Sequence, residues 1–257
     1  MTPFADQTYL LARRSVVRTV RQPANVVFPL VFPLLLRAVN SGGLDAATNL
    51  PGFPTDSFVA FALAIPFIQG ALFATMNAGT DLARDVQTGF LNRLSLTPMR
   101  GIVVLLGQLG GVVTMGVVQA VIYLAVGLAV GVRLASGPAG VLVLMAFAVL
   151  VSLGFGALGA FAALRTGSGE AVQSLFPVFF VFLFISSMNL PRDLIAIDWF
   201  RIAATANPVS YLIECVRSLI IGGWDVQALA LGFGIGAVIA VGALVLASWA
   251  LRVRMAR

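Results

Sequence analysis

Apolar residues run through most of the chain in stretches long enough to cross a lipid bilayer. A helix rises ~1.5 Å per residue, so about 20 apolar residues cross the ~30 Å hydrocarbon layer. We predict six spans, of which the first is short and contains Pro29, Pro33 and Arg37. Their ranges are 24–39, 57–79, 102–132, 139–164, 172–190 and 226–251. The pattern therefore predicts an all-α integral membrane protein with six helices in one bundle.

Arginine positions orient these spans. All 16 basic residues are arginines, and the cytoplasmic loops of membrane proteins carry an excess of basic residues. With the N-terminus inside, the inner arginines outnumber the outer ones. The inner set is Arg13, Arg14, Arg18, Arg21, Arg84, Arg93, Arg100, Arg165, Arg252, Arg254 and Arg257, and the outer set is Arg37, Arg133, Arg192, Arg201 and Arg217. We expect both termini to be cytoplasmic in a multi-pass protein of the cell (inner or plasma) membrane.

Composition agrees with a single membrane domain. Hydrophobic residues make up 60% of the 257 positions and charged residues only 10%, whereas about a quarter of a soluble domain is charged. We expect one domain over 1–257, with an interfacial helix at 1–23, a six-span bundle at 24–251 and a cytoplasmic tail at 252–257. We expect no cleavable signal peptide within 1–23.

The segment 3–22 has the pattern of a helix lying in the membrane surface. Apolar and basic positions recur on opposite sides at helical spacing. The apolar ones are Tyr9, Ala12, Val16 and Val20, and the basic ones are Arg14, Arg18 and Arg21. We predict that these arginines face anionic headgroups. A plain solvated helix is the alternative.

A second amphipathic helix is predicted at 81–101, between the second and third spans. Its apolar face comprises Leu82, Val86, Phe90 and Leu94. Thr97-Pro98 should end it, because proline disfavours helix at the residue before it. A cytoplasmic helix joined stiffly to two spans could transmit a push from a soluble partner. The alternative is an interfacial linker with no partner.

The segment 191–225 is predicted to lie outside. Asn207 and Pro208 can begin a helix that ends before Gly222. This helix would be about 21 Å long, too short to cross. Glu214 and Arg217, at i and i+3, are predicted to pair. We interpret the segment as a re-entrant or interfacial element, with a distorted half-span as the alternative.

Missing residue types exclude several chemistries. A Walker A loop needs lysine, and the chain has none; if ATP drives this protein, another chain must bind it. Without histidine, most transition-metal sites and Ser-His catalysis are disfavoured. Cys215 is the only cysteine. We therefore expect no catalytic residues, no metal or cofactor in this chain, and no binding of nucleic acid.

Polar and aromatic residues inside the spans are candidates for a substrate path. Most of the aromatic residues of the fifth predicted span can be explained by packing alone. The sharper hypothesis is that some of them line an apolar path for a hydrophobic small molecule. The candidates are Gln69, Met76, Asn77, Phe176, Phe180, Ser187 and Met188.

Two segments, 81–98 and 207–222, resemble the cytoplasmic and outer signatures of ABC-2 type permeases, and among these the daunorubicin-resistance-type drug exporters. The resemblance implies an exporter permease in which two ABC ATPase subunits supply ATP and Mg²⁺. A second permease, identical or paralogous, would complete the assembly in membrane lipid. One departure is Gln87-Thr88, where many members have a glutamate before the glycine, so contact with the ATPase is expected to differ in detail.

The resemblance also assigns roles to residues. By resemblance, Arg84, Asp85, Gly89, Arg93 and Pro98 belong to the region that couples to the ATPase. We expect the ATPases to push on the N-terminal helix as well, so Arg14, Arg18 and Asp81 are further coupling candidates. The expected outer-gate residues are Asn207, Pro208, Tyr211, Glu214 and Arg217. Export of a drug-like or lipid-like substrate, as in multidrug efflux and antibiotic resistance, is the function implied.

Two other functions stay open at this point. A secondary carrier driven by an ion gradient commonly needs a carboxylate inside the membrane, and the second to sixth predicted spans contain none. A membrane anchor or scaffold without transport activity would tolerate substitution of Asp85 or Gly89.

Overall fold

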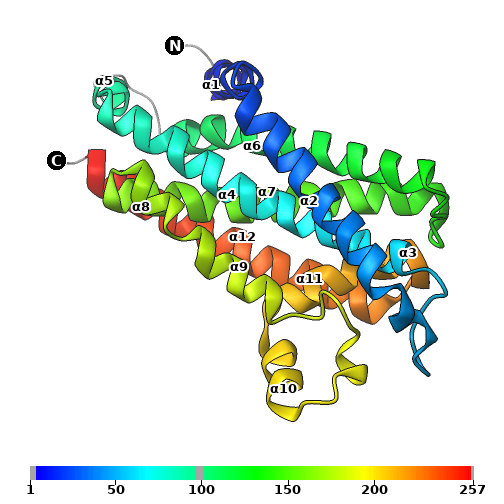
Figure 1. Ribbon diagram of the computed structural model, residues 1–257. Coiled ribbons are helices and arrows are strands. Elements are labelled where there is room, and N and C mark those ends of the chain that lie inside the picture. Colours follow the sequence, from blue (N-terminus) through cyan, green and yellow to red (C-terminus); the bar gives the residue numbers. More distant parts are fainter. Residues whose placement is uncertain (1–3, 96–100, 256–257) are drawn as a thin grey trace.

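A computed structural model describes residues 4–95 and 101–255, and these residues form helices and loops without any strand. In chain order the elements are α1 (Phe4–Val20), α2 (Pro23–Leu44), η1 (Asp45–Asn49), α3 (Phe58–Ala62), α4 (Ala64–Gln87), α5 (Phe90–Ser95), α6 (Gly101–Ala129), α7 (Gly137–Thr166), α8 (Gly169–Gln173), α9 (Phe176–Phe184), η2 (Arg192–Leu194), α10 (Asp198–Ala206), α11 (Pro208–Arg217), η3 (Ser218–Gly222) and α12 (Val226–Met255). The long helices lie side by side, and α1 and α5 are seen end-on, so they lie across them (Figure 1). We call the two ends of the bundle the α1 end and the α3 end.

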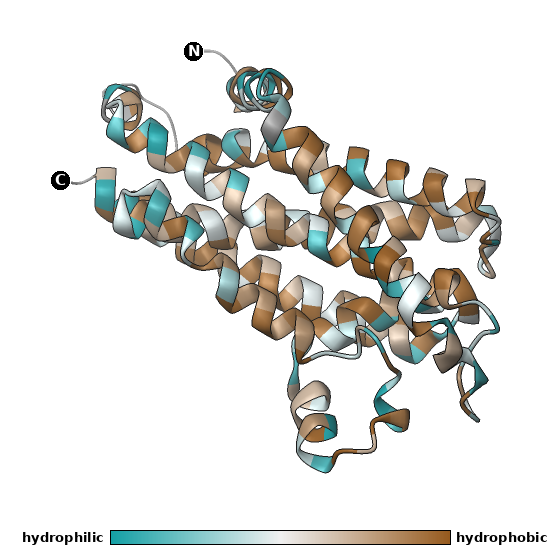
Figure 2. Ribbon diagram, in the orientation of Figure 1, coloured by the Kyte–Doolittle hydropathy of each residue, from teal (hydrophilic) through white to brown (hydrophobic). Residues whose placement is uncertain are grey.

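Within the described residues, five helices are long and apolar enough to cross a membrane. They are Asn25–Asn49, Phe58–Gln87, Gly101–Ala129, Gly137–Thr166 and Val226–Met255. Hydrophobic residues dominate their middle parts, and hydrophilic ones gather at the α1 end (Figure 2). The first span is longer than predicted, because α2 continues past Val39 to Leu44 and η1 follows it to Asn49. These helices confirm an all-α membrane architecture.

The fifth predicted span, 172–190, is not a continuous helix. The apolar stretch Gly169–Phe184 is shorter than the five long helices, and α9 ends at Phe184. In Figure 1, α9 ends partway along the bundle, and α11 continues toward the α3 end. The six-span count is therefore not confirmed.

Helix α4 lies at the centre of the bundle, where small residues allow close approach. A Cβ added at Gly159 of α7 would lie 2.0 Å from the carbonyl oxygen of Thr75 in α4. A Cβ added at Gly79 of α4 would lie 2.4 Å from the Cγ1 atom of Val172 in α8. Such contacts let helices pack tightly where lipid gives no hydrophobic driving force between them. As a result α4 is mostly buried.

The second span is interrupted at Leu63, between α3 and α4. Pro66 has no N–H to donate and its ring crowds the carbonyl of Ala62, four residues earlier. The chain tightens there, and the Leu63 N–H donates to the carbonyl of Ala60 at 3.3 Å. The carbonyls before the interruption need other donors.

The prediction of one helix through 81–95 is wrong. Helix α4 continues from the second span to Gln87, and α5 begins separately at Phe90. The Thr88 hydroxyl donates to the Arg84 carbonyl at 2.9 Å, and Gly89 takes a positive φ of +68°, a conformation open to glycine. Phe90 therefore does not share a helix with Leu82. Thr97 and Pro98 lie outside the described residues.

Candidate functional site

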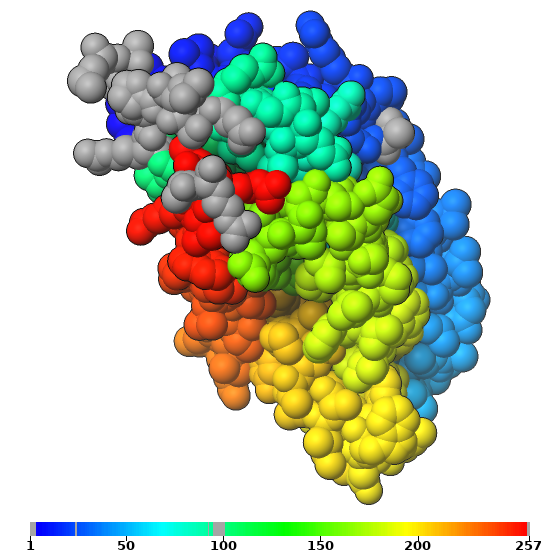
Figure 3. All heavy atoms as spheres, turned by 90° about the vertical axis from the view of Figure 1, so that its left-hand side faces the viewer, coloured from blue at the N-terminus to red at the C-terminus, as the bar shows by residue number. Residues whose placement is uncertain are grey.

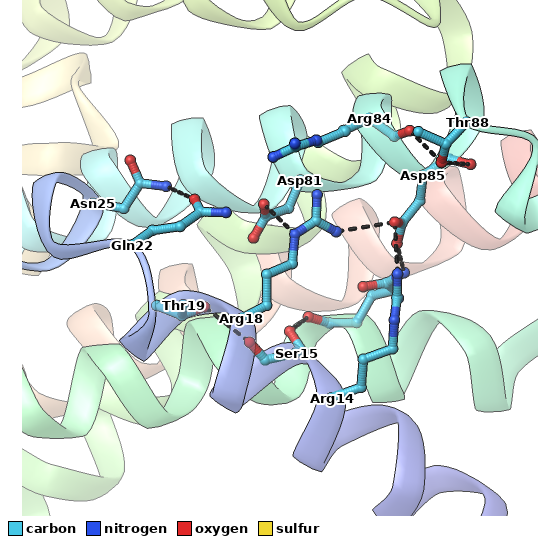
Figure 4. A network of polar contacts seen from close by, with 11 residues as sticks. Arg14, Ser15, Arg18, Thr19, Gln22, Asn25, Asp81, Arg84, Asp85 and Thr88 are labelled. Carbon is cyan, nitrogen blue, oxygen red and sulfur yellow. Dashed lines mark hydrogen bonds and ion pairs between the residues drawn. The ribbon is translucent and has the colours of Figure 1, made fainter.

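A cluster of charged side chains joins α1 to α4 and α6 at the α1 end of the bundle (Figure 4). Its centre is Asp85, whose side chain is only 3% exposed. Arg14 donates two hydrogen bonds to this carboxylate, at 2.9 and 3.0 Å, and Arg18 donates a third at 2.9 Å. The Gln108 amide of α6 also donates to it. We call Arg14, Arg18, Asp81, Asp85 and Gln108 the coupling cluster.

Two further contacts complete the coupling cluster. The Nε atom of Arg18 lies 3.1 Å from the Asp81 carboxylate, so Arg18 bridges two acidic residues one turn apart on α4. The Arg14 guanidinium lies over the Phe90 ring of α5, 3.8 Å from its centroid. A bidentate guanidinium–carboxylate pair is strong and directional, so α1, α4 and the start of α5 are held as one unit.

Glycines in α6 let α1 approach closely enough to form this cluster. A Cβ at Gly107 would lie 2.3 Å from the Leu11 Cβ, and one at Gly110 would lie 2.6 Å from the Ala12 Cβ. The Ser15 hydroxyl donates to the Gln108 carbonyl at 2.8 Å. Any larger residue at these glycines would displace α1.

The structure changes the interpretation of the N-terminal segment. Its helix is confirmed, but Arg14 and Arg18 point to aspartates of the same chain rather than away from it. Arg13 and Arg21 are exposed instead. Ala12 packs on α6, so the predicted apolar face does not remain whole. Sequence periodicity could not show this, because the acidic partners lie about 70 residues along the chain, with |i−j| of 67 to 71.

The remaining predicted coupling residues lie at the surface of the α1 end. Arg84 and Arg93 are exposed, and Gly89 forms the turn between them. Pro98 lies outside the described residues. The Gln87 amide donates to the Gly167 carbonyl at 3.1 Å, which ties the end of α4 to the α7–α8 connection. In Figure 3 the α4–α5 region, α8 and the end of α12 form one surface at this end.

A small polar cavity lies beneath the coupling cluster. Its volume of about 20 Å³ can hold one water molecule. The Asn77 amide, which lines it, donates to the Asn25 carbonyl of α2 at 3.2 Å. Asn77, predicted to line a substrate path, therefore belongs to the junction of α1, α2, α4 and α6.

An aromatic cluster joins α2, α4 and α9. Phe176 and Phe180 of α9 lie 4.9 Å apart between ring centroids, and Phe176 lies 5.4 Å from Phe73 of α4. Phe73 in turn contacts Phe28 and Phe32 of α2, at 5.5 and 6.0 Å. Sequence reasoning missed Phe28, Phe32 and Phe73, although the first two lie four residues apart on one helix face, a signal that could have been used.

Gln69 and Met76 lie on the same face of α4 as Phe73, one turn before and after it. Both are buried. Neither polar atom of the Gln69 amide has a hydrogen-bond partner within the described part of the chain. A buried amide without a partner is costly, so Gln69 is a candidate for contact with a polar group of a substrate.

Asn207 explains why α9 ends where it does. Its side-chain oxygen accepts from the Val209 N–H at 2.9 Å and so caps α11, which begins at Pro208. Its amide nitrogen donates to the carbonyls of Phe182 and Ile185, at 2.5 and 2.9 Å. One side chain therefore bonds backbone groups at the end of α9 and at the start of α11.

The predicted pairing of Glu214 with Arg217 is wrong. Glu214 instead accepts two hydrogen bonds from Arg192, at 2.8 and 2.7 Å. Arg192 stacks on Tyr211, whose hydroxyl donates to the Thr205 carbonyl at 2.9 Å. Burial alone would lower the pKa of Arg192, but the Glu214 carboxylate outweighs it and raises that pKa. Arg192 lies in a loop 22 residues away, beyond the reach of helical spacing rules.

Arg217 is buried and binds backbone carbonyls. It donates to Phe61 at 3.4 Å, to Ser187 at 3.1 Å and to Met188 at 3.1 Å. Its guanidinium carbon also lies 3.5 Å from the centroid of the Phe61 ring. The Ser187 N–H donates to the Ser210 hydroxyl at 3.1 Å. Ser187 and Met188, predicted substrate-path residues, are therefore held beside α11 with the predicted outer-gate residues.

In the part of the chain that the structure describes, five long apolar helices packed around a buried charge cluster indicate a multi-pass membrane protein. Residues 6–221 match the family described as ABC-2 type transporter, and the chain belongs to this family. In the described residues no group of three or more His, Cys, Asp or Glu side chains could hold a metal ion.

Two named relatives support the permease class. The chain is 29% identical over 210 residues to the daunorubicin resistance ABC transporter permease protein DrrB1 of Streptomyces coeruleorubidus, a match covering 78% of this chain and 70% of that protein. It is 22% identical over 218 residues to ycf38 of Cyanophora paradoxa, named as a transport permease, with 84% of this chain and 74% of that protein covered.

Proposed function

We propose that this chain is the transmembrane subunit of an ATP-binding-cassette exporter that moves a hydrophobic, drug-like or lipid-like molecule out of the cell. The observation that carries the proposal is the coupling cluster, which fastens α1 and the start of α5 to the end of α4. Family membership and the drug-resistance relative support it. ATP and Mg²⁺ would bind to two copies of a separate ATPase.

The coupling mechanism follows from the continuity of α4. The ATPases would contact the exposed surface around Arg84, Gly89 and Arg93, on the cytoplasmic side. Helix α4 runs unbroken from Ala64 to Gln87, so a displacement at its end reaches the interruption at Leu63. ATP can drive this movement only if the two ATPase geometries bind it with different affinity.

The topology that we propose keeps both termini cytoplasmic in the inner or plasma membrane. Six crossings would result if α9 and α11 together form one crossing, the fifth in chain order. Its two pieces would be joined through Asn207. Non-helical backbone is tolerated at membrane depth when it is buried in protein, and Asn207 is 4% exposed. Residues 1–257 would form one domain, paired with a second copy or a related permease.

We propose that the substrate moves along the aromatic cluster between α2, α4 and α9, with Gln69 offering a polar contact. Exposed apolar side chains flank this cluster on α2 and α9, among them Phe28 at 56% and Phe184 at 49%. The outer gate would comprise the end of α9 and the residues Asn207, Pro208, Tyr211, Glu214 and Arg217.

Co-expression with an ABC ATPase encoded beside this chain tests the proposal. The two proteins should co-purify in detergent, and the complex in lipid should hydrolyse ATP faster in the presence of a hydrophobic drug. Replacement of Arg93 by Glu should weaken co-purification, whereas Arg201→Glu on α10 serves as the matched control. Absence of co-purification together with unchanged ATP turnover would contradict the proposed function.

A further inference from the structure

Two interrupted crossings meet at one side chain near the α3 end. The second span is interrupted after α3, and the chain leaves helical geometry after α9. Both interruptions expose carbonyl groups that no helix satisfies. Arg217 donates to carbonyls at both of them, to Phe61 before the first and to Ser187 and Met188 after the second.

Arg217 makes these contacts without a carboxylate of its own. Arg217 forms no ion pair among the described residues, because Glu214 pairs with Arg192 instead. Glu214 adds only a longer-range attraction to Arg217. Arg217 is 6% exposed, so its charge is compensated mainly by its hydrogen bonds to carbonyls and by the Phe61 ring. Charged residues buried at membrane depth are costly and mark functional elements.

A second buried arginine provides a comparison within the same region. Arg37 of α2 is also 6% exposed and also donates to α3, to the Val59 carbonyl at 3.1 Å. It has no contact with the segment after α9 among its described hydrogen bonds, and its Nε atom lacks a partner. Of these two buried arginines, Arg217 is therefore the one whose described hydrogen bonds link both interruptions.

We propose that Arg217 is the positioning residue that keeps the outer gate closed, by joining the two interrupted crossings through one guanidinium. This rests on the proposed function, in which the α3 end is the outer side of an exporter. Opening requires α11 to move relative to α3, and the hydrogen bonds to Phe61, Ser187 and Met188 must break. The planar guanidinium can reach three carbonyls at once, which a lysine cannot do with the same geometry.

The chain contains its own reporter of this movement. Cys215 is fully buried, and it is the only cysteine. It packs against α12, where a Cβ at Gly232 would lie 2.2 Å from the Cys215 Cβ. Cys215 also belongs to the same apolar core as Phe58 and Phe61 of α3. A buried thiol of this kind is inert, so alkylation requires α11 to leave this packing.

The test measures alkylation of Cys215 by N-ethylmaleimide in the full chain, reconstituted into lipid nanodiscs. The wild type should react slowly. Arg217→Met should react at least about tenfold faster, because loss of hydrogen bonds to a charged group shifts an opening equilibrium by that factor or more. Arg217→Lys should be intermediate, and Arg37→Met should stay at the wild-type rate.

Two results would overturn the proposal. One is a wild-type rate for Arg217→Met; the other is an equal increase in Arg37→Met, which would show that any buried arginine merely stabilises the fold. Unfolding midpoints are measured on all variants. If Arg217 had a merely structural role, the alkylation rate of Cys215 would rise in each variant in proportion to the decrease of its unfolding midpoint. If Arg217→Met does not fold, Phe61→Leu removes the ring below the guanidinium and should raise reactivity severalfold; an unchanged rate there also refutes the proposal. The experiment contains no ATPase, so failure of ATPase binding would not affect its outcome.

Discussion

At the residue scale, the buried charges at the two ends of the molecule are compensated in different ways. Asp85 collects hydrogen bonds from Arg14, Arg18 and Gln108, so its charge is compensated by partners from two other helices. At the α3 end, Arg217 relies on backbone carbonyls. Removing one member of a buried charge group strands the others, which makes both places sensitive to single substitutions.

Asp85→Asn should destabilise the protein strongly. It leaves Arg14 and Arg18 without their shared carboxylate, and loss of one partner of a buried pair costs about 3–5 kcal/mol. Thermal unfolding in detergent measures the effect. Asp198→Asn is the matched control, because Asp198 and Arg201 form an exposed pair on α10 and should contribute less than about 1 kcal/mol. Equal decreases of the unfolding midpoint in Asp85→Asn and Asp198→Asn would contradict the central role of Asp85 in the coupling cluster.

Glu214 should be more strongly coupled energetically to Arg192 than to Arg217. A double-mutant cycle with Glu214→Gln and Arg192→Gln should give a coupling energy of roughly 1 kcal/mol, since both side chains are 23% exposed and bidentate. The cycle with Arg217→Gln should give a clearly smaller value in the same unfolding assay. A larger coupling energy between Glu214 and Arg217 than between Glu214 and Arg192 would support the i, i+3 pairing instead.

At the scale of elements, hydrophobic pattern predicted most helices and missed their interruptions. Three of the five long helices, Gly101–Ala129, Gly137–Thr166 and Val226–Met255, were predicted nearly to their ends, because about 20 apolar residues in a row leave few alternatives. The break at Leu63 and the turn at Gly89 involve the local residues Pro66 and Thr88, whereas the end of α9 involves Asn207, 22 to 25 residues away. The sequence singled out Arg14, Asp85 and Glu214 but not their contacts, since Arg192–Glu214 and Arg14–Asp85 join segments far apart in sequence.

The packing of α1 on α6 should depend on the glycines of α6. Gly110→Val would place a Cβ 2.6 Å from the Ala12 Cβ, so α1 must shift and the coupling cluster must loosen. We expect reduced drug efflux and a lower unfolding midpoint. Gly242→Val in α12 is the control, because nothing lies within 4 Å of its added Cβ. Similar effects of both substitutions would point to helix propensity instead of packing.

At the scale of the whole molecule, the account places a force-receiving surface at the α1 end and a closure at the α3 end. Helix α4 connects them, with the coupling cluster at one end and Leu63 at the other. Short amphipathic helices lie across the α1 end (Figure 1), where a soluble partner can reach them. The chain has no lysine for a Walker A loop, so in the proposed exporter a separate ATPase would supply the movement.

The proposed orientation, with the α1 end cytoplasmic, can be tested by labelling single cysteines. In a Cys215→Ala background, Arg84→Cys should react with a membrane-impermeant maleimide in inside-out vesicles only. Arg201→Cys on α10 should react in right-side-out vesicles only. Arg84→Cys labelled from the outer side would place the coupling cluster away from any cytoplasmic ATPase.

The most direct test of the account is the amount of substrate exported per ATP hydrolysed by the reconstituted permease–ATPase complex. Arg14→Gln loosens the link between α1 and α4, while Asp85 keeps its hydrogen bonds from Arg18 and Gln108. Arg201→Gln is the control, because it makes the same substitution in the exposed pair of Arg201 with Asp198. The account predicts a severalfold fall in this ratio for Arg14→Gln and none for Arg201→Gln. An unchanged ratio in Arg14→Gln would contradict the claim that the coupling cluster transmits the movement.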